Sequence, residues 1–132
     1  MRRTVALRND QTLVDLHDVL QGAFEWDDDH LYSFWPSGKF WDREGKEYTH
    51  PFVLEDVGYG SRPRSAMVRL DRLRLVKGQK IAYVFDFGDE WRVLLTLSAI
   101  RADDGAFYPQ ILAVVGDAPP QYPEYDDEAD AA

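Results

Sequence analysis

The stretch IAYVFDFGDEWRVLLTL, residues 81–97, decides the fold. Its two halves, IAYVFDF and WRVLLTL, are rich in β-branched, aromatic and aliphatic residues, and they flank the short polar sequence GDE. Such runs on either side of a Gly-Asp pair are typical of a β-hairpin, because glycine supplies the positive φ that a type II′ turn needs at its first central position. We therefore predict a central hairpin over about residues 81–97, with Gly88 and Asp89 in its turn.

This turn sets the expected register of the hairpin, in which Asp86 lies opposite Trp91. Both faces of the hairpin are then largely apolar, which predicts that it is covered on both sides. One face would carry Ala82, Val84, Asp86, Trp91, Val93 and Leu95. The other face would carry Tyr83, Phe85, Phe87, Arg92 and Leu94.

Asp86 is the exception on its predicted face, because a buried carboxylate needs polar partners. It either accepts hydrogen bonds that fix the fold, or it serves as a ligand-binding or catalytic carboxylate. The tripeptide Asp86-Phe87-Gly88 also occurs in protein kinases, but those enzymes need a Gly-rich loop, a strand lysine and a His-Arg-Asp loop as well. The chain has none of these, so a kinase is excluded.

A helix is predicted over about residues 12–24. Thr12, followed by Asp15, resembles a capping box. His17 lies about 40° from Leu13 at 100° per residue, on the apolar stripe of this helix, where a histidine is more often a packed core residue than a ligand. The stripe consists of Leu13, Leu16, Leu20, Ala23 and Phe24.

The other segments complete an α+β domain with a mainly antiparallel sheet, on which the helix packs. Short strands are expected at residues 2–8, 30–35, 52–54 and 107–115, and the rest of residues 36–66 has the Gly, Pro and charge content of loops. We predict one domain over residues 1–116. Residues 117–132 contain three prolines and a run of acids, which predicts an extended or disordered tail.

Composition excludes several classes of protein. The chain has 132 residues, 45% of them hydrophobic, and no cysteine, which excludes a disulfide framework and a thiolate metal site. It shows neither a signal peptide nor an apolar stretch long enough to span a membrane. We expect a cytoplasmic protein with no cofactor and no membrane partner. Its net charge of −9 disfavours general attraction to nucleic acid.

The charges are unevenly distributed along the chain. Residues 61–80 carry seven basic residues and one acid, Asp71, whereas residues 117–132 carry six acids and no base. The basic segment is either simply exposed to solvent, or it pairs with acidic surface elsewhere or with the acidic tail, or it binds nucleic acid. The candidate nucleic-acid surface comprises Arg62, Arg64, Arg69, Arg72, Arg74, Lys77 and Lys80.

Histidines and carboxylates provide the only other candidate site. His30 follows Asp27, Asp28 and Asp29, but this spacing matches no metal template, and we assign no metal ligand and no catalytic residue. An acid–base or metal site would need the fold to bring His17, His30 and Asp86 together. The candidate polar site comprises His17, His30, Asp86, Asp89 and Trp91.

Three stretches together resemble the plasmid pRiA4b ORF-3-like family, which is also known from passenger proteins of insertion elements. Residues 12–35 carry Leu-His, Phe-x-Trp and His-Leu-Tyr-x-Phe, residues 78–97 carry Tyr-x-Phe-Asp-Phe-Gly-Asp-x-Trp, and residues 108–123 carry Tyr-Pro and Gly-x-x-Pro-Pro. The resemblance implies an α+β domain and no particular activity. Family members often have a further strand before the first one here, so an open sheet edge is expected. The usual Pro-Pro-Glu-Asp ending is replaced here.

Three functions remain open at this point. A non-enzymatic binding or adaptor domain that works through a protein partner is favoured, because catalytic motifs are absent and an open edge and a Pro-Tyr-acid tail are expected. The first alternative is a nucleic-acid-associated protein of a mobile element that uses residues 62–80. The second is a small metal-dependent or acid–base hydrolase.

Overall fold

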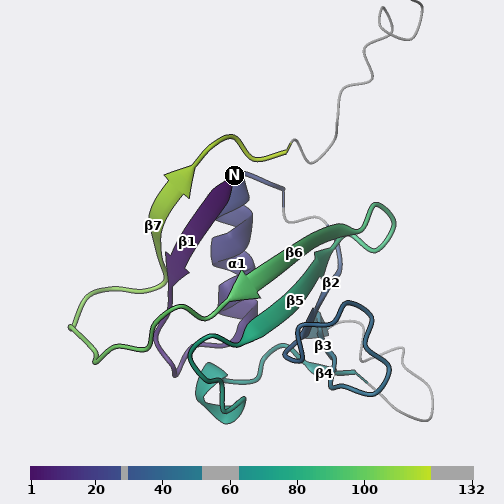
Figure 1. Ribbon diagram of the computed structural model, residues 1–132, viewed down its shortest axis with the longest axis horizontal. Helices are drawn as coiled ribbons and strands as arrows, with labels where there is room; N and C mark the ends of the chain where they lie inside the picture. Colours follow the sequence, from purple (N-terminus) through teal and green to yellow (C-terminus); the bar gives the residue numbers. More distant parts are fainter. Residues whose placement is uncertain (28–29, 52–62, 120–132) are drawn as a thin grey trace, which may run out of the picture.

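A computed structural model describes residues 1–27, 30–51 and 63–119 of the protein, and within them one α-helix packs against a five-stranded sheet and a two-stranded ribbon (Figure 1). The sheet has the strand order β4-β3-β2-β5-β6, and the ribbon pairs β1 with β7. The predicted α+β class is therefore confirmed. The elements are β1 (Arg2–Ala6), α1 (Leu13–Phe24), β2 (Tyr32–Trp35), β3 (Tyr48–Thr49), β4 (Arg64–Ser65), β5 (Lys80–Phe85), β6 (Trp91–Thr96) and β7 (Gln110–Val115).

Helix α1 begins at the predicted capping box. The Thr12 side chain accepts a hydrogen bond from the Asp15 amide, and the Asp15 carboxylate accepts one from the Thr12 amide at 2.8 Å. The helix ends at Glu25, which has the left-handed conformation (φ 57°) that terminates many helices. Its apolar stripe, with His17, is buried as predicted.

An aromatic layer joins α1 to the sheet. In the antiparallel pairing of β2 with β5, Tyr32 lies opposite Phe85 and Phe34 opposite Tyr83, so these four rings share one face. All four are buried in the main hydrophobic core together with the helix stripe. Because all four residues of β2 are buried, the strand lacks the alternating pattern by which half-buried strands are recognised.

The predicted hairpin exists, but its register was wrong by one residue. Phe85 pairs with Trp91, Val84 with Arg92, and the loop spans residues 86–90, so Asp86 belongs to the turn and does not face Trp91. Positive φ occurs at Asp86 (63°) and Glu90 (52°), and not at Gly88. A shift of one residue exchanges the two faces of a strand.

The shift places the side chains of β6 differently from the prediction. Trp91, Val93 and Leu95 pack on the main core, next to β5 residues such as Phe85 and Tyr83. The opposite face of β5 forms a second cluster with Trp35, Phe40 and Phe87. Strand β5 of the hairpin lies between β2 and β6 and is buried on both faces, as predicted. Strand β6 lies at the edge of the sheet and alternates between half-buried and exposed residues, so this half of the hairpin is covered on one side.

The segment that carries the basic residues is held against the start of α1. The amides of Leu13 and Val14 donate to the carbonyls of Val68 and Ala66, and the amide of Leu70 donates to the carbonyl of Gln11. The first two of these bonds use amides at the helix N-terminus that have no partner within the helix. A short 3-10 helix at Leu70–Arg72 follows. Residues 66–71 are therefore held by backbone bonds to residues 9–14, at the start of α1.

The ribbon of β1 and β7 lies beside α1, at the opposite end of the molecule from β3 and β4 (Figure 1). Arg3 of β1 donates to the carbonyl of Ala23 at 2.7 Å and so links the ribbon to the helix. The antiparallel register changes between Thr4 and Val5, which leaves Leu112 as the extra residue of a β-bulge. β7 confirms the predicted last strand.

Several predictions concern segments at the limits of the described residues. The predicted strand at 52–54 lies outside them, and so does Arg62. Of the predicted tail, Ala118 packs on the main core and the Pro119 carbonyl accepts a hydrogen bond from the Trp26 indole at 3.0 Å, whereas residues 120–132 lie outside the described part. The domain boundary at 116 thus stays a prediction. No helix among the described residues is long and apolar enough to cross a membrane.

Candidate functional site

Asp86 is a buried carboxylate that organises the turn between β5 and β6. Its Oδ1 atom accepts hydrogen bonds from the amides of Gly88 (3.1 Å) and Asp89 (3.3 Å). Its backbone bonds the carbonyl of Leu31 and the amide of Glu90, which closes the loop. A short acidic side chain tolerates the left-handed conformation because it can bond the backbone two residues on. Asp86 therefore has a structural role in the turn.

The side chain of His30 contacts the Asp86 carboxylate. Its Nε2 atom lies 3.4 Å from Asp86 Oδ2, and its side chain is 36% exposed against 9% for Asp86. The imidazole also meets the edge of the Phe85 ring, with centroids 5.9 Å apart. Of the three residues that an acid–base or metal site would need, the fold thus brings His30 and Asp86 into contact.

His17 occupies a different neighbourhood. It is 1% exposed, its ring stacks on Tyr32 at 3.6 Å, and its Nδ1 atom lies 2.7 Å from the Tyr83 hydroxyl. The Phe85 ring also contacts it, at 5.8 Å, so Phe85 touches both histidines. The hydrogen bond and the stacking that are described for His17 make it a packed core residue. Sequence reasoning did not identify Tyr83 and Gln21 as its polar neighbours.

The two remaining candidates have separate environments. Trp91 is partly buried and packs on Trp26, with ring centroids 5.5 Å apart, while the Asp89 side chain is exposed beside the turn. Among the described residues, no group of three or more His, Asp or Glu is placed to hold a metal ion. The five candidates are therefore spread over the β5–β6 turn and the hydrophobic core.

The basic segment is solvent-exposed wherever it is described. Arg64, Arg69, Arg72, Arg74, Lys77 and Lys80 are all exposed, while Val68, Leu70, Leu73 and Leu75 between them pack on the main core. This explains the alternation of basic and apolar residues in the sequence. Arg69 forms an ion pair with Asp71 at 2.6 Å, and Lys80 donates to the Thr96 hydroxyl.

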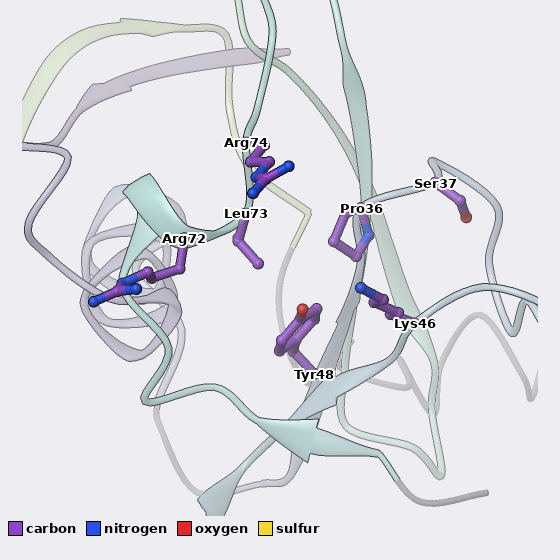
Figure 2. Close-up of a pocket in the computed structure, with 7 residues that line it drawn as sticks. All are labelled: Pro36, Ser37, Lys46, Tyr48, Arg72, Leu73 and Arg74. Atoms are coloured by element: carbon purple, nitrogen blue, oxygen red, sulfur yellow. The ribbon is translucent and has the colours of Figure 1, made fainter.

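Three residues of this segment help to line an open hollow of about 570 Å³, which we call the basic hollow (Figure 2). Figure 2 shows the side chains of Lys46 and Tyr48 ending at the hollow, with Leu73 opposite and Arg74 above them. Arg72 and Ser37 lie at the rim, and their polar ends point away from the hollow. The lining contains three cationic side chains and no carboxylate. It consists of Pro36, Ser37, Lys46, Tyr48, Arg72, Leu73 and Arg74.

Lys46 was missed by sequence reasoning because it lies far along the chain from the other cations. Strand β3 follows it directly and pairs with β2 on one side and β4 on the other. The strand β3 has only two residues and its pairing with β4 is parallel, so neither periodicity nor a turn signal predicts it. The approach of Lys46 to Arg74 therefore depends on contacts between distant segments.

The chain matches a known protein family over most of its length. The sequence profile of the plasmid pRiA4b ORF-3-like proteins matches residues 1–123. The chain belongs to this family. The uncharacterized protein y4hQ of Sinorhizobium fredii (strain NBRC 101917 / NGR234) is 29% identical to this pRiA4b ORF-3-like chain over 109 residues, which are 80% of this chain and 50% of y4hQ. The chain thus spans about half the length of that relative.

A solved structure has the same fold. The crystal structure of MM3350, a protein of unknown function from Methanosarcina mazei Go1, superposes with a TM-score of 0.66 at 23% sequence identity. The match covers 84% of this chain and 59% of the MM3350 chain. The likeness supports the α+β architecture of this pRiA4b ORF-3-like chain. Both relatives are described as uncharacterized or of unknown function, so they carry no activity over to it.

Proposed function

We propose that this chain is a non-enzymatic binding domain that takes up an extended segment of a protein partner along strand β7. The observation that carries the proposal is the exposure of a strand whose last five residues are all apolar. Ile111, Leu112, Val114 and Val115 are 45–59% exposed although they lie in a regular, hydrogen-bonded strand. Contiguous exposed apolar side chains of this kind mark interaction sites on soluble proteins.

The edge of the ribbon supports pairing with an additional strand. Within the described part of the chain, β1 and β7 pair only with each other, and a two-stranded ribbon is marginally stable in water. Natural edge strands are usually protected by lysine, proline or other charged residues, but β7 contains no charge and no proline. A strand added to β7 would pair its free backbone groups and cover its side chains.

The partner we infer is a different protein segment with apolar residues and a net positive charge. The chain carries a net charge of −9, which attracts a basic segment and repels a second copy. The bulge at Leu112 also disfavours antiparallel pairing of two β7 strands, because two bulges would then interrupt one short ladder. Charge and register therefore both favour a heterologous partner.

Peptides selected from a displayed library of short random sequences test this proposal. We expect the enriched peptides to be apolar with Lys or Arg nearby, and to protect β7 amides from hydrogen exchange when bound. The double variant Leu112→Lys/Val114→Lys should weaken their binding by at least about ten-fold, a loss of about 1.4 kcal/mol. Both side chains are more than half exposed, so the fold should tolerate the change.

Ile100→Lys is the matched control, because Ile100 is 66% exposed and lies outside β7. It should leave peptide binding unchanged. Selected peptides that bind the double variant as tightly as the unmodified chain would overturn the proposal. A dimer of the free chain in sedimentation, abolished by the double variant, would overturn it in favour of a second copy.

A further inference from the structure

We propose that the basic hollow is a binding site for a phosphate-bearing ligand of about nucleotide size. The site is distinct from β7, since β3 and β7 lie at opposite ends of the molecule (Figure 1). It narrows the predicted nucleic-acid surface of residues 62–80 to Arg72 and Arg74 and adds Lys46, which lies outside that segment.

The charges of the hollow are the first argument. Lys46, Arg72 and Arg74 line it, and within the described part of the chain no carboxylate forms an ion pair with any of them. Arg69 of the same segment differs from these three cations, because its guanidinium forms an ion pair with the Asp71 carboxylate at 2.6 Å. In a chain with 24 acidic residues against 15 basic ones, three unneutralised cations around one hollow favour an anion.

The second argument is the geometry of the donors. Arginine binds phosphate through paired N–H groups, and lysine adds a point charge. The Tyr48 hydroxyl supplies a neutral donor, and no hydrogen bond to it is described within the resolved ranges 1–27, 30–51 and 63–119. Tyr48 is itself buried and fixed by pairing with Phe34 in β2 and Arg64 in β4. Pairing on both sides of Tyr48 therefore holds this residue in place at the hollow before a ligand binds.

The backbone of Arg74 is the third argument. Its φ of 54° is left-handed, a conformation that costs a non-glycine residue free energy and that occurs most often where a surrounding structure or a function requires it. Residues 66–71 are held to residues 9–14, at the start of α1, by backbone hydrogen bonds, and the chain then turns at Arg74. The strained turn brings this guanidinium to the hollow.

The size and the apolar side chains of the hollow point to a phosphate ester. A volume of about 570 Å³ lies within the range typical of small-molecule sites. Pro36 and Leu73 face the hollow from opposite sides, and the non-phosphate part of the ligand would lie between them. A mononucleotide and a phosphate within a single strand of nucleic acid share this chemistry, and an experiment can separate them.

Calorimetric titration of the full chain with three probes, adenosine monophosphate, inorganic phosphate and a short oligo-dT, tests the site at about 50 mM salt, where phosphate contacts are strongest. We expect at least one of the nucleotide probes to bind. Lys46→Gln and Arg74→Gln should each weaken that binding by about ten-fold, a loss of about 1.4 kcal/mol, because each removes a hydrogen bond between a cation and the phosphate.

Lys77→Gln is the matched control, because Lys77 is an exposed cation of the same segment that does not line the hollow. It should leave the affinity within about two-fold, the change expected for one distant surface charge. Tight binding of adenosine monophosphate assigns the site to a free nucleotide, and tight binding of oligo-dT alone assigns it to a strand. The proposal is overturned if none of the probes binds, or if Lys77→Gln weakens binding as much as Lys46→Gln and Arg74→Gln do.

Discussion

The Nδ1 atom of His17 lies 2.7 Å from the Tyr83 hydroxyl, in the aromatic layer between α1 and β5. The side-chain amide of Gln21 donates to the same oxygen at 3.0 Å, so the hydrogen of the hydroxyl is available to His17. Tyr83 thereby connects two polar side chains of one helix face to the sheet. Because burial of an unpaired polar group is costly, this link fixes how the helix and the sheet meet.

Tyr83→Phe is expected to destabilise the protein by about 1–3 kcal/mol, because it leaves buried polar atoms of His17 and Gln21 without this partner. Chemical unfolding followed by tryptophan fluorescence measures the loss. Tyr108→Phe is the control, since it removes a hydroxyl that bonds Asp104 at the surface. An equal loss of stability in the two variants would show that the buried hydrogen bonds of Tyr83 stabilise the fold no more than the surface bond of Tyr108 does.

Thr12→Ala should lower the stability by about 1 kcal/mol, because the Thr12 side chain caps the first turn of α1. Thr12→Ser keeps a hydroxyl that can accept from the Asp15 amide and should retain most of the stability. The difference between the two melting temperatures measures the cap alone. If Ser and Ala behave alike at this position, the hydrogen bond to the Asp15 amide is not the source of stability.

Local signals explain which elements could be predicted. The capping box and the helical spacing of the leucines lie within one short segment, so α1 was predicted to within one residue of its start. The hairpin strands were recognised by their β-rich composition, but their register depends on which turn residues take positive φ. A Gly-Asp pair favoured Gly88, whereas the structure places positive φ at Asp86 and Glu90.

Contacts between distant segments explain what could not be predicted. Strands β3 and β4 have two residues each and pair with one another in parallel, which leaves no pattern in the sequence. The basic hollow depends on that pairing, since Lys46 precedes β3 while Arg72 and Arg74 follow β4. The separation of His17 from the His30–Asp86 contact likewise follows from how α1 packs on β5, which spacing along the chain does not reveal.

The turn between β5 and β6 should depend on Asp86 more than on Gly88. Asp86→Ala removes the acceptor of two amide hydrogen bonds at a left-handed position, and we expect a loss of about 1–3 kcal/mol. Gly88→Ala should be neutral or stabilising by up to about 1 kcal/mol, since Gly88 does not need positive φ. A methyl group at Gly88 would meet only Asp86 Oδ1, at 3.4 Å.

Urea unfolding of both variants separates these two roles. Asp86→Asn belongs in the same series, because an amide oxygen still accepts from the two backbone amides and asparagine tolerates left-handed φ. It should therefore lose less stability than Asp86→Ala. A larger loss for Gly88→Ala than for Asp86→Ala would mean that the glycine is the residue on which the turn depends.

Asp104 should make the loop before β7 sensitive to acid. The Ala106 amide and then the Tyr108 hydroxyl donate to its carboxylate, and these bonds hold the pKa of Asp104 below its usual value. A carboxylate with a lowered pKa in the folded state adds stability above its unfolded pKa, and that stability is lost as pH falls through the folded pKa. The contribution is therefore present at neutral pH and disappears in acid.

Asp104→Asn should melt at a lower temperature than the unmodified chain at pH 7, and the difference should shrink steadily as the pH is lowered below about 4, the ordinary range for an aspartate. Melting temperatures of the two proteins, measured at matched ionic strength from pH 7 to the acid limit of folding, provide the test. Asp10→Asn is the control, because the contact described for Asp10 is an exposed ion pair with Arg8. A gap between Asp104→Asn and the unmodified chain that stays constant into acid would show that the charge of Asp104 does not stabilise the loop.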